Sequence, residues 1–405
     1  MLRVVLSVFS VLFGFVSAAT PVSAATLGLT RIVDGPSIAA PIHAAAPPGD
    51  SERLFILGRG GDISVYDRTT GGLSPLYAGP SDVSQAGERG AYAIAFDQDF
   101  ASNGQLYLSY VTTGDVHRVV EIDTLASDVD AAPLREILAI QHPDDGTGNH
   151  YGGWLGTDTD GNLILTTGDS GSRAVNDPNN SLLAKVLRID PETGDTEVIG
   201  DGLRNPYRAG YDTATDTLII ADVGEGRREE INLGTDGANY GWPAFEGTLP
   251  FAASAFPDGT VFTDPIFEYD HETDPIQGRS VTGGEIYRGD VAELDGQYFF
   301  GDFFSDQVFS FAIEGGEAGP LTVWDLDIDV GDIAALSSFG LDGDGNLYLL
   351  DLTGEVFLVT SAEGFVTSTP VPLPASVWLL AGALVLLGAQ RRKAPTSSKC
   401  ADQRN

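Results

Sequence analysis

Six similar segments recur along this chain, and they limit its fold more than any other feature. Each has a turn rich in Asp, Asn and Gly followed by a short apolar stretch of β-favouring residues, which is typical of antiparallel hairpins. A second apolar stretch follows several of them, as in "DISVYD", "HRVVEID", "DQVFSF" and "EVFLV". The six segments cover residues 51–61, 102–114, 159–171, 214–226, 294–306 and 343–355.

The spacing of these segments predicts how their sheets are arranged. They follow one another at roughly 50-residue intervals, with one longer gap between the fourth and the fifth. A β-sandwich is the alternative for an all-β chain, but six regular units favour radial repetition. We therefore predict an all-β, six-bladed β-propeller over residues 25–365, with inserted loops between about 225 and 294. No long amphipathic helix is expected, and functional residues belong on the loops around the central channel.

Two of the turns, "DTDGN" (158–162) and "DGDGN" (342–346), invite a calcium-binding interpretation. An EF-hand loop needs glycine at its sixth position, and counted from Asp158 that position is Leu163. We therefore interpret both segments as hairpin turns.

The first 24 residues have the composition of a signal peptide. Arg3 precedes an apolar run, and two "VSA" sites that end at Ala18 and Ala24 suit a signal peptidase. The alternative is an N-terminal membrane anchor, for which the apolar run is short. We predict cleavage and export of the body.

Residues 366–405 form a second targeting segment. It contains the motif "VPLPA" (371–375), an apolar stretch predicted as a transmembrane helix (376–390) and a basic tail (391–405). This ending resembles the VPLPA/PEP-CTERM sorting signal of Gram-negative bacteria, which an exosortase-type enzyme recognises. The resemblance implies a periplasmic, cell-surface or matrix location with at least transient membrane anchorage through the helix. The alternative is a plain C-terminal anchor in the same orientation.

The region between the two targeting segments is strongly acidic. Of the 22 basic residues, Arg3 and five residues after position 370 lie outside it, and of the 58 acidic residues only Asp402 does, so its net charge is −41. The negative electrostatic field of this region excludes nucleic acid and anionic membrane surfaces as partners, and it is compatible with binding of cations such as Ca²⁺. The only cysteine, Cys400, lies in the predicted cytoplasmic tail, so the exported body has no disulfide.

One of the five histidines, His150, stands in the glycine- and aromatic-rich segment "NHYGGW" (149–154). A histidine on a loop at the channel is a candidate general base, because imidazole exchanges protons near neutral pH. A histidine flanked by glycines is also often a simple turn residue. The other four have no supporting motif, and we expect them at surface or loop positions: His43, His117, His142 and His271.

Eight segments, in order over roughly residues 50–360, resemble the PQQ-dependent glucose/sorbosone dehydrogenases, which include soluble quinoprotein glucose dehydrogenase and the aldose sugar dehydrogenases. The resemblance implies a six-bladed propeller that oxidises the C1 hydroxyl of a sugar, or a similar small alcohol. Pyrroloquinoline quinone (PQQ) beside Ca²⁺ would accept the hydride, and electrons would pass to an external acceptor. The segments are "GERGAYAIAFDQDFASNGQLYLSY", "NHYGGWLGTDTDGNLILTTGDSG", "LLAKVLRIDPETG", "GLRNPYRAGYD", "ADVGEGRREEINLGTDGANYGWPAFEG", "SVTGGEIYRG", "GQYFFGDFFSDQVFSF" and "SSFGLDGDGNLYLLD".

The same resemblance implies three catalytic residues. His150 occupies the family's His-x-x-Gly position and would be the general base. Asp169 in "TTGDSG" matches the carboxylate that orients this histidine, and Arg204 in "GLRNP" matches the arginine that stabilises negative charge on the quinone. Each has a structural alternative, since Asp169 could end a strand and Arg204 could pair with any of many carboxylates.

Cofactor and metal contacts are implied in the same way. Glu88, Asn205 and Arg204 would lie near the quinone, and the backbone carbonyls of Gly224 and Glu225 would bind Ca²⁺. Glu225 could equally be a solvated surface residue.

The sequence departs from the family where cations should bind the three carboxylates of PQQ. The fifth- and sixth-blade segments contain no basic residue, the body's only lysine is Lys185 in a predicted strand, and Asp306 next to Ser305 would repel the cofactor. Loop arginines could compensate: Arg279, Arg227 or Arg228.

Three functions follow from these observations. The first is an exported PQQ- and Ca²⁺-dependent sugar dehydrogenase. The alternative is a catalytically inactive propeller, with or without Ca²⁺, that acts as a surface or extracellular-matrix module binding carbohydrate or protein. A Ca²⁺-dependent lactonase is the third, but it calls for acidic side chains ringing the channel, which these motifs do not resemble.

Overall fold

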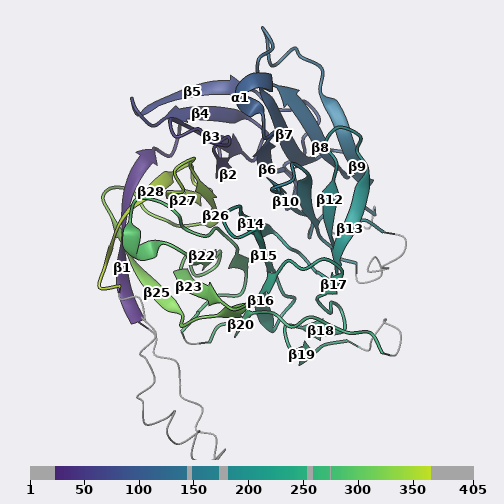
Figure 1. Cartoon of the computed structure of the whole chain (residues 1–405), viewed down its shortest axis with the longest axis vertical. Coiled ribbons are helices and arrows are strands. Elements are labelled where there is room, and N and C mark those ends of the chain that lie inside the picture. The colour runs from purple at the N-terminus through teal and green to yellow at the C-terminus, as the bar shows by residue number, and fades with distance from the viewer. Residues whose placement is uncertain (1–22, 144–147, 173–180, 253–258, 274, 366–405) are drawn as a thin grey trace, which may run out of the picture. The chain divides into compact units, whose positions relative to one another are not determined.

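Antiparallel sheets of four strands repeat around a central axis in the computed structural model (Figure 1). The structure describes residues 23–143, 148–172, 181–252, 259–273 and 275–365. Within each sheet the chain passes from one strand to its neighbour through turns, as expected for the repeated hairpin pattern. The first three sheets are β2 (Pro41–Ala45), β3 (Arg53–Gly58), β4 (Ile63–Asp67) and β5 (Gly72–Tyr77); β6 (Ala91–Phe96), β7 (Gln105–Val111), β8 (Val116–Asp123) and β9 (Arg135–Gln141); and β10 (Gly152–Thr157), β11 (Leu163–Thr167), β12 (Lys185–Ile189) and β13 (Thr196–Asp201).

The remaining strands complete a ring of six blades, so the predicted all-β propeller is confirmed. Each repeated segment identified in the sequence contains the second strand of one blade, which is β3, β7, β11, β15, β22 or β27 in turn. The last three sheets are β14 (Arg208–Asp212), β15 (Thr217–Asp222), β16 (Arg228–Leu233) and β20 (Phe267–Asp270); β21 (Val281–Thr282), β22 (Gln297–Asp302), β23 (Val308–Glu314) and β25 (Thr322–Ile328); and β26 (Leu336–Leu341), β27 (Leu347–Asp351), β28 (Val356–Glu363) and β1 (Ser23–Val33).

The ring is closed by strands from opposite ends of the chain. β1 pairs antiparallel with β28, with Thr26 opposite Glu363, and parallel with β25, with Thr26 opposite Asp325. The sixth blade therefore combines three C-terminal strands with the N-terminal one. Among the inner strands, β2 pairs parallel with β26, so the fifth, sixth and first blades share one continuous sheet. This closure leaves few unpaired strand edges.

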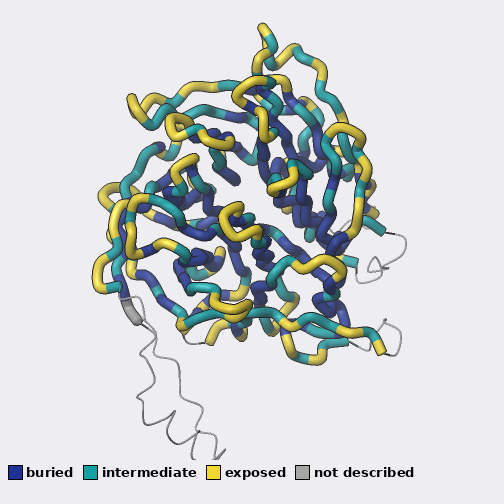
Figure 2. Tube along the Cα trace, viewed as in Figure 1, coloured by how far each residue is buried: buried dark blue, intermediate teal, exposed yellow. Residues whose placement is uncertain are grey.

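The hydrophobic core lies between adjacent blades. Figure 2 shows buried residues along the strands of every sheet and exposed residues mainly at turns. Between the first two blades the ring of Phe96 lies 5.0 Å from those of Phe55 and Phe100. Phe100 begins α1 (Phe100–Asn103), which together with the 3-10 turn η2 (Ala292–Leu294) is all the helix in the described residues. This agrees with the expected absence of a long amphipathic helix.

Both Asp-rich turns are hairpin turns, as predicted. Asp158 Oδ1 accepts hydrogen bonds from the backbone N–H groups of Asp160 and Asn162 at 3.0 and 2.8 Å, and the turn joins β10 to β11. Asp342 makes the same contacts between β26 and β27. Both carboxylates are therefore used to close turns.

The longer gap in the repeat contains short inserted strands. They add to the edge of the third blade and form a separate hairpin near the fourth, as expected for loops on a propeller. The insertions are β17 (Ala238–Asn239), β18 (Phe245–Glu246) and β19 (Leu249–Pro250), and a further short strand, β24 (Glu317–Ala318), pairs with β23.

Two predicted segments lie outside the described residues: the signal peptide, apart from Ser23 and Ala24, and the whole sorting signal from 366 to 405 with its transmembrane helix. In the described part of the chain, no helix has the length and hydropathy needed to cross a bilayer. β1 begins at Ser23, so cleavage after Ala24 would remove its first two residues, whereas cleavage after Ala18 would leave the strand whole.

Candidate functional site

His150 lies on the loop that enters β10, the inner strand of the third blade. Its φ of +55° is in the left-handed region, which a residue with a Cβ rarely occupies. The carboxylate of Glu88, on the loop that enters the second blade, holds this backbone by accepting the His150 N–H at 2.7 Å. A strained backbone held by a charged contact is common at functional sites.

The imidazole of His150 is oriented by a buried carboxylate. Its Nδ1 lies 2.8 Å from Asp169 Oδ1, and the second oxygen of Asp169 accepts the indole N–H of Trp242 at 2.9 Å. Asp169 is 1% exposed. Because an ionised carboxylate only accepts hydrogen bonds, Nδ1 carries the proton and Nε2 presents a lone pair.

Arg204 faces that lone pair. Its Nη2 lies 3.1 Å from His150 Nε2, and its Nη1 donates to the carbonyl of Val223 at 2.8 Å. The guanidinium carbon is 5.6 Å from the centre of the Trp242 ring. Guanidinium is a donor only, so this contact agrees with a neutral His150 protonated at Nδ1. The Nε of Arg204 is buried and has no acceptor among the described residues.

The "RN" pair is fixed by Asp222 at the end of β15. Its two carboxylate oxygens accept the backbone N–H groups of Arg204 and Asn205 at 2.8 and 2.6 Å. Burial raises the pKa of Asp222 to about 7, against the opposing effect of these hydrogen bonds and of Arg204. Asn205 Oδ1 accepts the N–H of Gly152 at 3.1 Å, which ties this loop to β10.

The structure therefore brings together His150, Asp169 and Arg204, as predicted, and adds two residues that the sequence did not identify. Trp242 follows the "NY" of "ANYGWP", and Asp222 opens "DVGEG". A sequence pattern that could have pointed to each of them was present, because an aspartate that ends a strand and an aromatic residue in a glycine-rich loop are common site residues. Nothing in the linear sequence says which residues they contact.

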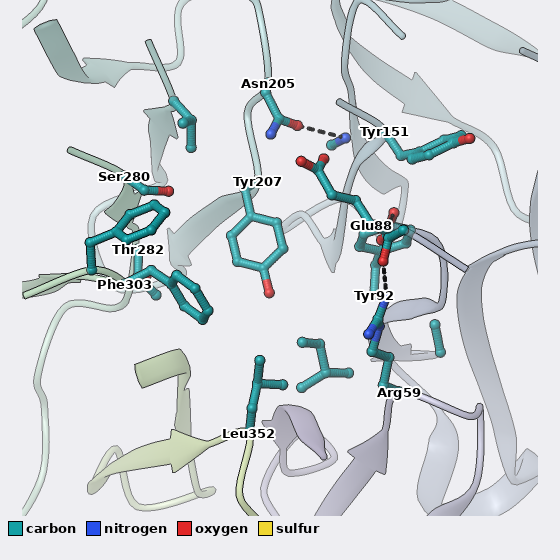
Figure 3. A pocket seen from close by; sticks show the side chains of 16 residues that line it. Arg59, Glu88, Tyr92, Tyr151, Asn205, Tyr207, Ser280, Thr282, Phe303 and Leu352 are labelled. Atoms are coloured by element: carbon teal, nitrogen blue, oxygen red, sulfur yellow. Dashed lines mark hydrogen bonds between the residues drawn. The ribbon is translucent and has the colours of Figure 1, made fainter. Parts of the chain in front are cut away.

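A cavity of about 310 Å³ opens beside this group at the channel mouth. Figure 3 shows Tyr207 near its middle, with Glu88 and Asn205 on one side and Ser280 and Thr282 on the other. Of the residues expected near a cofactor, Glu88 and Asn205 line this cavity, whereas His150, Asp169 and Arg204 are not among its lining residues. The other lining residues are Ile42, Arg59, Gly87, Ala91, Tyr92, Tyr151, Gly152, Val223, Phe303, Phe304 and Leu352.

Arg59 is the one basic residue among the described residues that line this cavity. It was not identified from the sequence, because it follows β3 in the first blade and no motif marks it. Its Nε and Nη2 donate to the carbonyl of Arg89 at 3.1 and 2.9 Å, and Nη2 also donates to the carbonyl of Gly87. Arg59 thus fixes the loop that carries Glu88.

The suggested compensating arginines do not line the cavity. Arg279 pairs with Glu272 at 3.2 Å, and Arg228 pairs with Glu268 and Asp270. The expected repulsion by Asp306 has no support in the geometry either, since Asp306 and Ser305 are not lining residues. Asp306 instead accepts the backbone N–H of Leu336 at 3.1 Å. Lys185 is a blade residue, as predicted, and pairs with Asp201 at 2.7 Å.

The turn with the predicted calcium ligands surrounds one carboxylate oxygen. Glu246 Oε1 accepts backbone N–H groups from Glu225 through Arg228 at 2.7 to 3.2 Å, and its Oε2 is buried with no partner among the described residues. No group of three or more His, Cys, Asp or Glu side chains in the described part of the chain is placed to hold a metal ion. Backbone carbonyls of Gly224 and Glu225 alone fall short of the six to eight oxygens that Ca²⁺ takes.

The expectation that the other histidines lie at the surface or on loops is wrong for His43 and His117, which are buried strand residues of β2 and β8. Burial lowers the pKa of each to about 3. His142 is on a loop but is also buried, and its pKa falls to about 4 for the same reason. His271 pairs with Glu229 at 2.7 Å, which raises its pKa despite the opposing effect of burial. Packing between blades decides these positions.

Comparison with known proteins assigns the chain to a family and identifies relatives of it. A sequence model of the family described as "Glucose / Sorbosone dehydrogenase" matches residues 39–350. The chain is 27% identical over 225 residues to aldose sugar dehydrogenase YliI of Escherichia coli (52% of this chain, 60% of that protein). It is 30% identical over 232 residues to the HIPL2 protein of Arabidopsis thaliana (46% of this chain, 32% of that protein). The chain therefore spans less than two thirds of either relative.

Solved structures share the fold. The PQQ-bound form of an aldose sugar dehydrogenase from Streptomyces coelicolor superposes with a TM-score of 0.67 at 22% identity, over 85% of this chain and 99% of that one. The apo-form of the soluble aldose sugar dehydrogenase from Escherichia coli gives a TM-score of 0.68 at 22% identity, over 84% and 100%.

Proposed function

Because the chain belongs to the glucose/sorbosone dehydrogenase family, we propose that it oxidises the C1 hydroxyl of a sugar or a similar small alcohol, with PQQ and Ca²⁺ as cofactors. The observation that carries this proposal is the chain of contacts from Trp242 through Asp169 to His150. It leaves one imidazole nitrogen free of a proton, on a residue whose neighbours Tyr151 and Gly152 line the cavity.

His150 acts as the general base. Its Nε2 takes the proton of the substrate hydroxyl, and the Asp169 carboxylate stabilises the imidazolium that forms. Asp169 is itself held by two donors, the Trp242 indole and the N–H of Gly171 at 2.8 Å, so it keeps one orientation. A base positioned in this way typically contributes on the order of 10² to 10⁴ in rate.

Arg204 occupies the position that the substrate hydroxyl needs. We expect its Nη2 to leave His150 Nε2 when substrate binds and to stabilise negative charge in the cavity instead. Its unpartnered Nε–H is a further donor at the same place.

PQQ supplies hydride acceptance when it is bound. The lining residues fit PQQ only in part: the Asn205 amide suits a quinone oxygen, while Arg59, Ser280 and Thr282 are left for the carboxylates. The buried Arg204 Nε–H would reach a quinone oxygen only after Arg204 moves, because Arg204 does not line the cavity. A single cation among these lining residues predicts weaker cofactor binding than a site with several would give. Ca²⁺ would use the carbonyls of Gly224 and Glu225 and would need the remaining ligands from cofactor and water.

The surroundings of the reaction are proposed from the terminal segments. The predicted signal peptide and sorting signal support a location in the periplasm, at the cell surface or in the extracellular matrix, after handling by an exosortase-type enzyme. Electrons then pass to an external acceptor.

Dye reduction tests the proposal. Purified protein supplied with PQQ and Ca²⁺ is expected to reduce a dye with one or more members of an aldose panel, and His150→Ala should abolish this. Chelation of Ca²⁺ should stop the reaction without unfolding the protein, because no described side-chain cluster depends on a metal ion.

The second candidate is the inactive binding module, which the presence of only one cation among the described lining residues favours. This second candidate would be supported if PQQ failed to bind at micromolar concentration while an aldose still bound to the protein.

A further inference from the structure

The inner strands of the propeller run between two cavities, one at each end of the channel. Residues at the start of these strands, such as Ile42 of β2 and Tyr92 of β6, line the cavity described above. Residues near their ends line a second cavity of about 250 Å³ at the opposite mouth. This second cavity plays no part in the proposed oxidation. Its walls are mostly apolar, with contributions from Ile94, Phe96, Leu155 and Leu341.

His43 places a fixed hydrogen-bond donor in the second cavity. Its Nδ1 accepts the backbone N–H of Ile94 at 3.3 Å, which puts the ring proton on Nε2. Burial lowers the pKa of His43 to about 3, so the ring is uncharged at physiological pH. Nε2–H has no acceptor in the part of the chain that the structure describes, and the residue lines the cavity.

Trp154 and Glu285 add two more polar groups. Trp154 lies in β10 and Glu285 follows β21, so the three residues come from three different blades. Among the described residues, neither the indole N–H of Trp154 nor the carboxyl group of Glu285 has a hydrogen-bond partner. Burial raises the pKa of Glu285 to about 8, so near neutral pH this group is mostly a carboxylic acid that can both donate and accept.

Arg208 lies near His43 and Glu285 and forms no ion pair among the described residues, but it is 1% exposed, does not line the cavity and donates to the carbonyls of Ile42 and Tyr207. The two aspartates close to the cavity are already paired. Asp212 binds Arg288 at 2.6 Å, and Asp342 binds Arg68 at 3.0 Å. Asp342 also accepts hydrogen bonds from its own turn. Ligand sites typically combine apolar walls with a few convergent polar groups. No Arg or Lys is among the described residues that line this cavity, and the aspartate that lines it, Asp342, is paired. A charged ligand would therefore find no unpaired counter-charge on the cavity wall, whereas hydroxyl oxygens would satisfy the two N–H donors and the acid.

We propose that this opposite mouth is a second binding site, for a small uncharged polyhydroxy compound of about monosaccharide size. His43 and Trp154 donate to its oxygens, and Glu285 exchanges hydrogen bonds with a hydroxyl group. The site is separate from the proposed oxidation and does not require PQQ or Ca²⁺.

Two tryptophans allow each mouth to be monitored separately. Trp154 lines the second cavity, and the indole N–H of Trp242 is bonded to Asp169 beside the proposed catalytic histidine. In ¹⁵N-labelled full-length protein, both indole signals are assigned through Trp154→Phe and Trp242→Phe. The protein is then titrated without PQQ using D-glucose, myo-inositol, D-glucuronate and D-glucosamine. The last two are the charged controls.

We expect D-glucose or myo-inositol to shift the Trp154 signal, and the charged controls to shift it at several-fold higher concentration. Glu285→Leu removes one hydrogen-bonding group and should weaken binding about three- to tenfold, whereas Glu285→Gln should retain it. His150→Ala should leave the Trp154 response unchanged, with thermal unfolding as the check on folding. A Trp154 signal that no neutral probe moves, or that the charged probes move equally, overturns the proposal. Shifts of Trp242 alone would support only the catalytic mouth.

Discussion

The guanidinium of Arg204 lies 3.1 Å from the unprotonated Nε2 of His150, although 54 residues separate them in the chain. The proposed base is therefore covered by a cation in this structure. In the proposed oxidation, we expect a substrate hydroxyl that reaches Nε2 to displace the arginine and free its donors, so that proton removal and charge stabilisation would begin with the same movement.

Arg204→Ala is expected to lower kcat by on the order of 10² to 10³, because it removes the donors that stabilise negative charge. Arg204→Lys should recover part of this loss, since a point charge replaces the fork of donors. Steady-state kinetics with saturating PQQ measures both. If Arg204→Ala left kcat unchanged, its contact with His150 would be structural only.

Asp169→Asn should reduce kcat by on the order of 10³ while PQQ still binds. The amide can donate to Nδ1, which favours the tautomer with its proton on Nε2 and removes the base. Trp242→Phe is the matched control, because it removes one donor to Asp169 and leaves the carboxylate in place. We expect it to cost less than Asp169→Asn when the two are compared under the same conditions. An equal loss would show that orientation, rather than tautomer, is what Asp169 supplies.

Arg59→Gln is expected to weaken PQQ binding by on the order of tenfold, because a charge-assisted hydrogen bond to a carboxylate is lost. Cofactor fluorescence in an equilibrium titration measures this without turnover. Arg279→Gln is the control, since Arg279 pairs with Glu272 and does not line the cavity. Equal affinities in the two variants would remove Arg59 from the cofactor site.

The stability of the fold should depend on pH through Glu285. Burial and the nearby Asp212 raise its pKa in the folded protein to about 8, and Arg208 opposes this shift, whereas an unfolded glutamate titrates near 4.3. Between these values the folded state binds the proton more tightly, so the free energy of unfolding falls as pH rises through the window. Below about 4 and above about 8 this contribution is constant.

Glu285→Gln removes this titration. The difference in Tm, variant minus natural protein, should therefore increase from pH 5 to pH 8 and then level off. Differential scanning calorimetry across this range measures the difference. A constant difference would mean that Glu285 is ionised at neutral pH in the folded chain.

Some features were predictable because local sequence determines them. The Asp-, Asn- and Gly-rich turns specify hairpins wherever they occur, so all six repeated segments were located correctly from their spacing. The membership of the sixth blade was not predictable in this way. β1 pairs with β28, more than 300 residues away, and that pairing exists only once the ring closes.

The residues of the candidate functional site also differ in how far the sequence could identify them. His150, Asp169 and Arg204 stand in short motifs and could be identified from the chain alone. Arg59 could not, because no motif marks it. Trp242 and Asp222 carry local signals of a site residue, but the residues that they contact are decided by the tertiary structure. The buried positions of His43 and His117 were missed for the same reason, since inward and outward faces of a strand differ only after the sheets pack.

The sequence by itself determined the hairpins, the acidic charge of the body and the residues capable of acid–base chemistry, because these depend on neighbours along the chain. Tertiary structure alone decided which nitrogen of His150 is free, which cation lines the cavity and that a second cavity exists. Each of these depends on side chains from different blades meeting at the channel, and only closure of the ring brings them together.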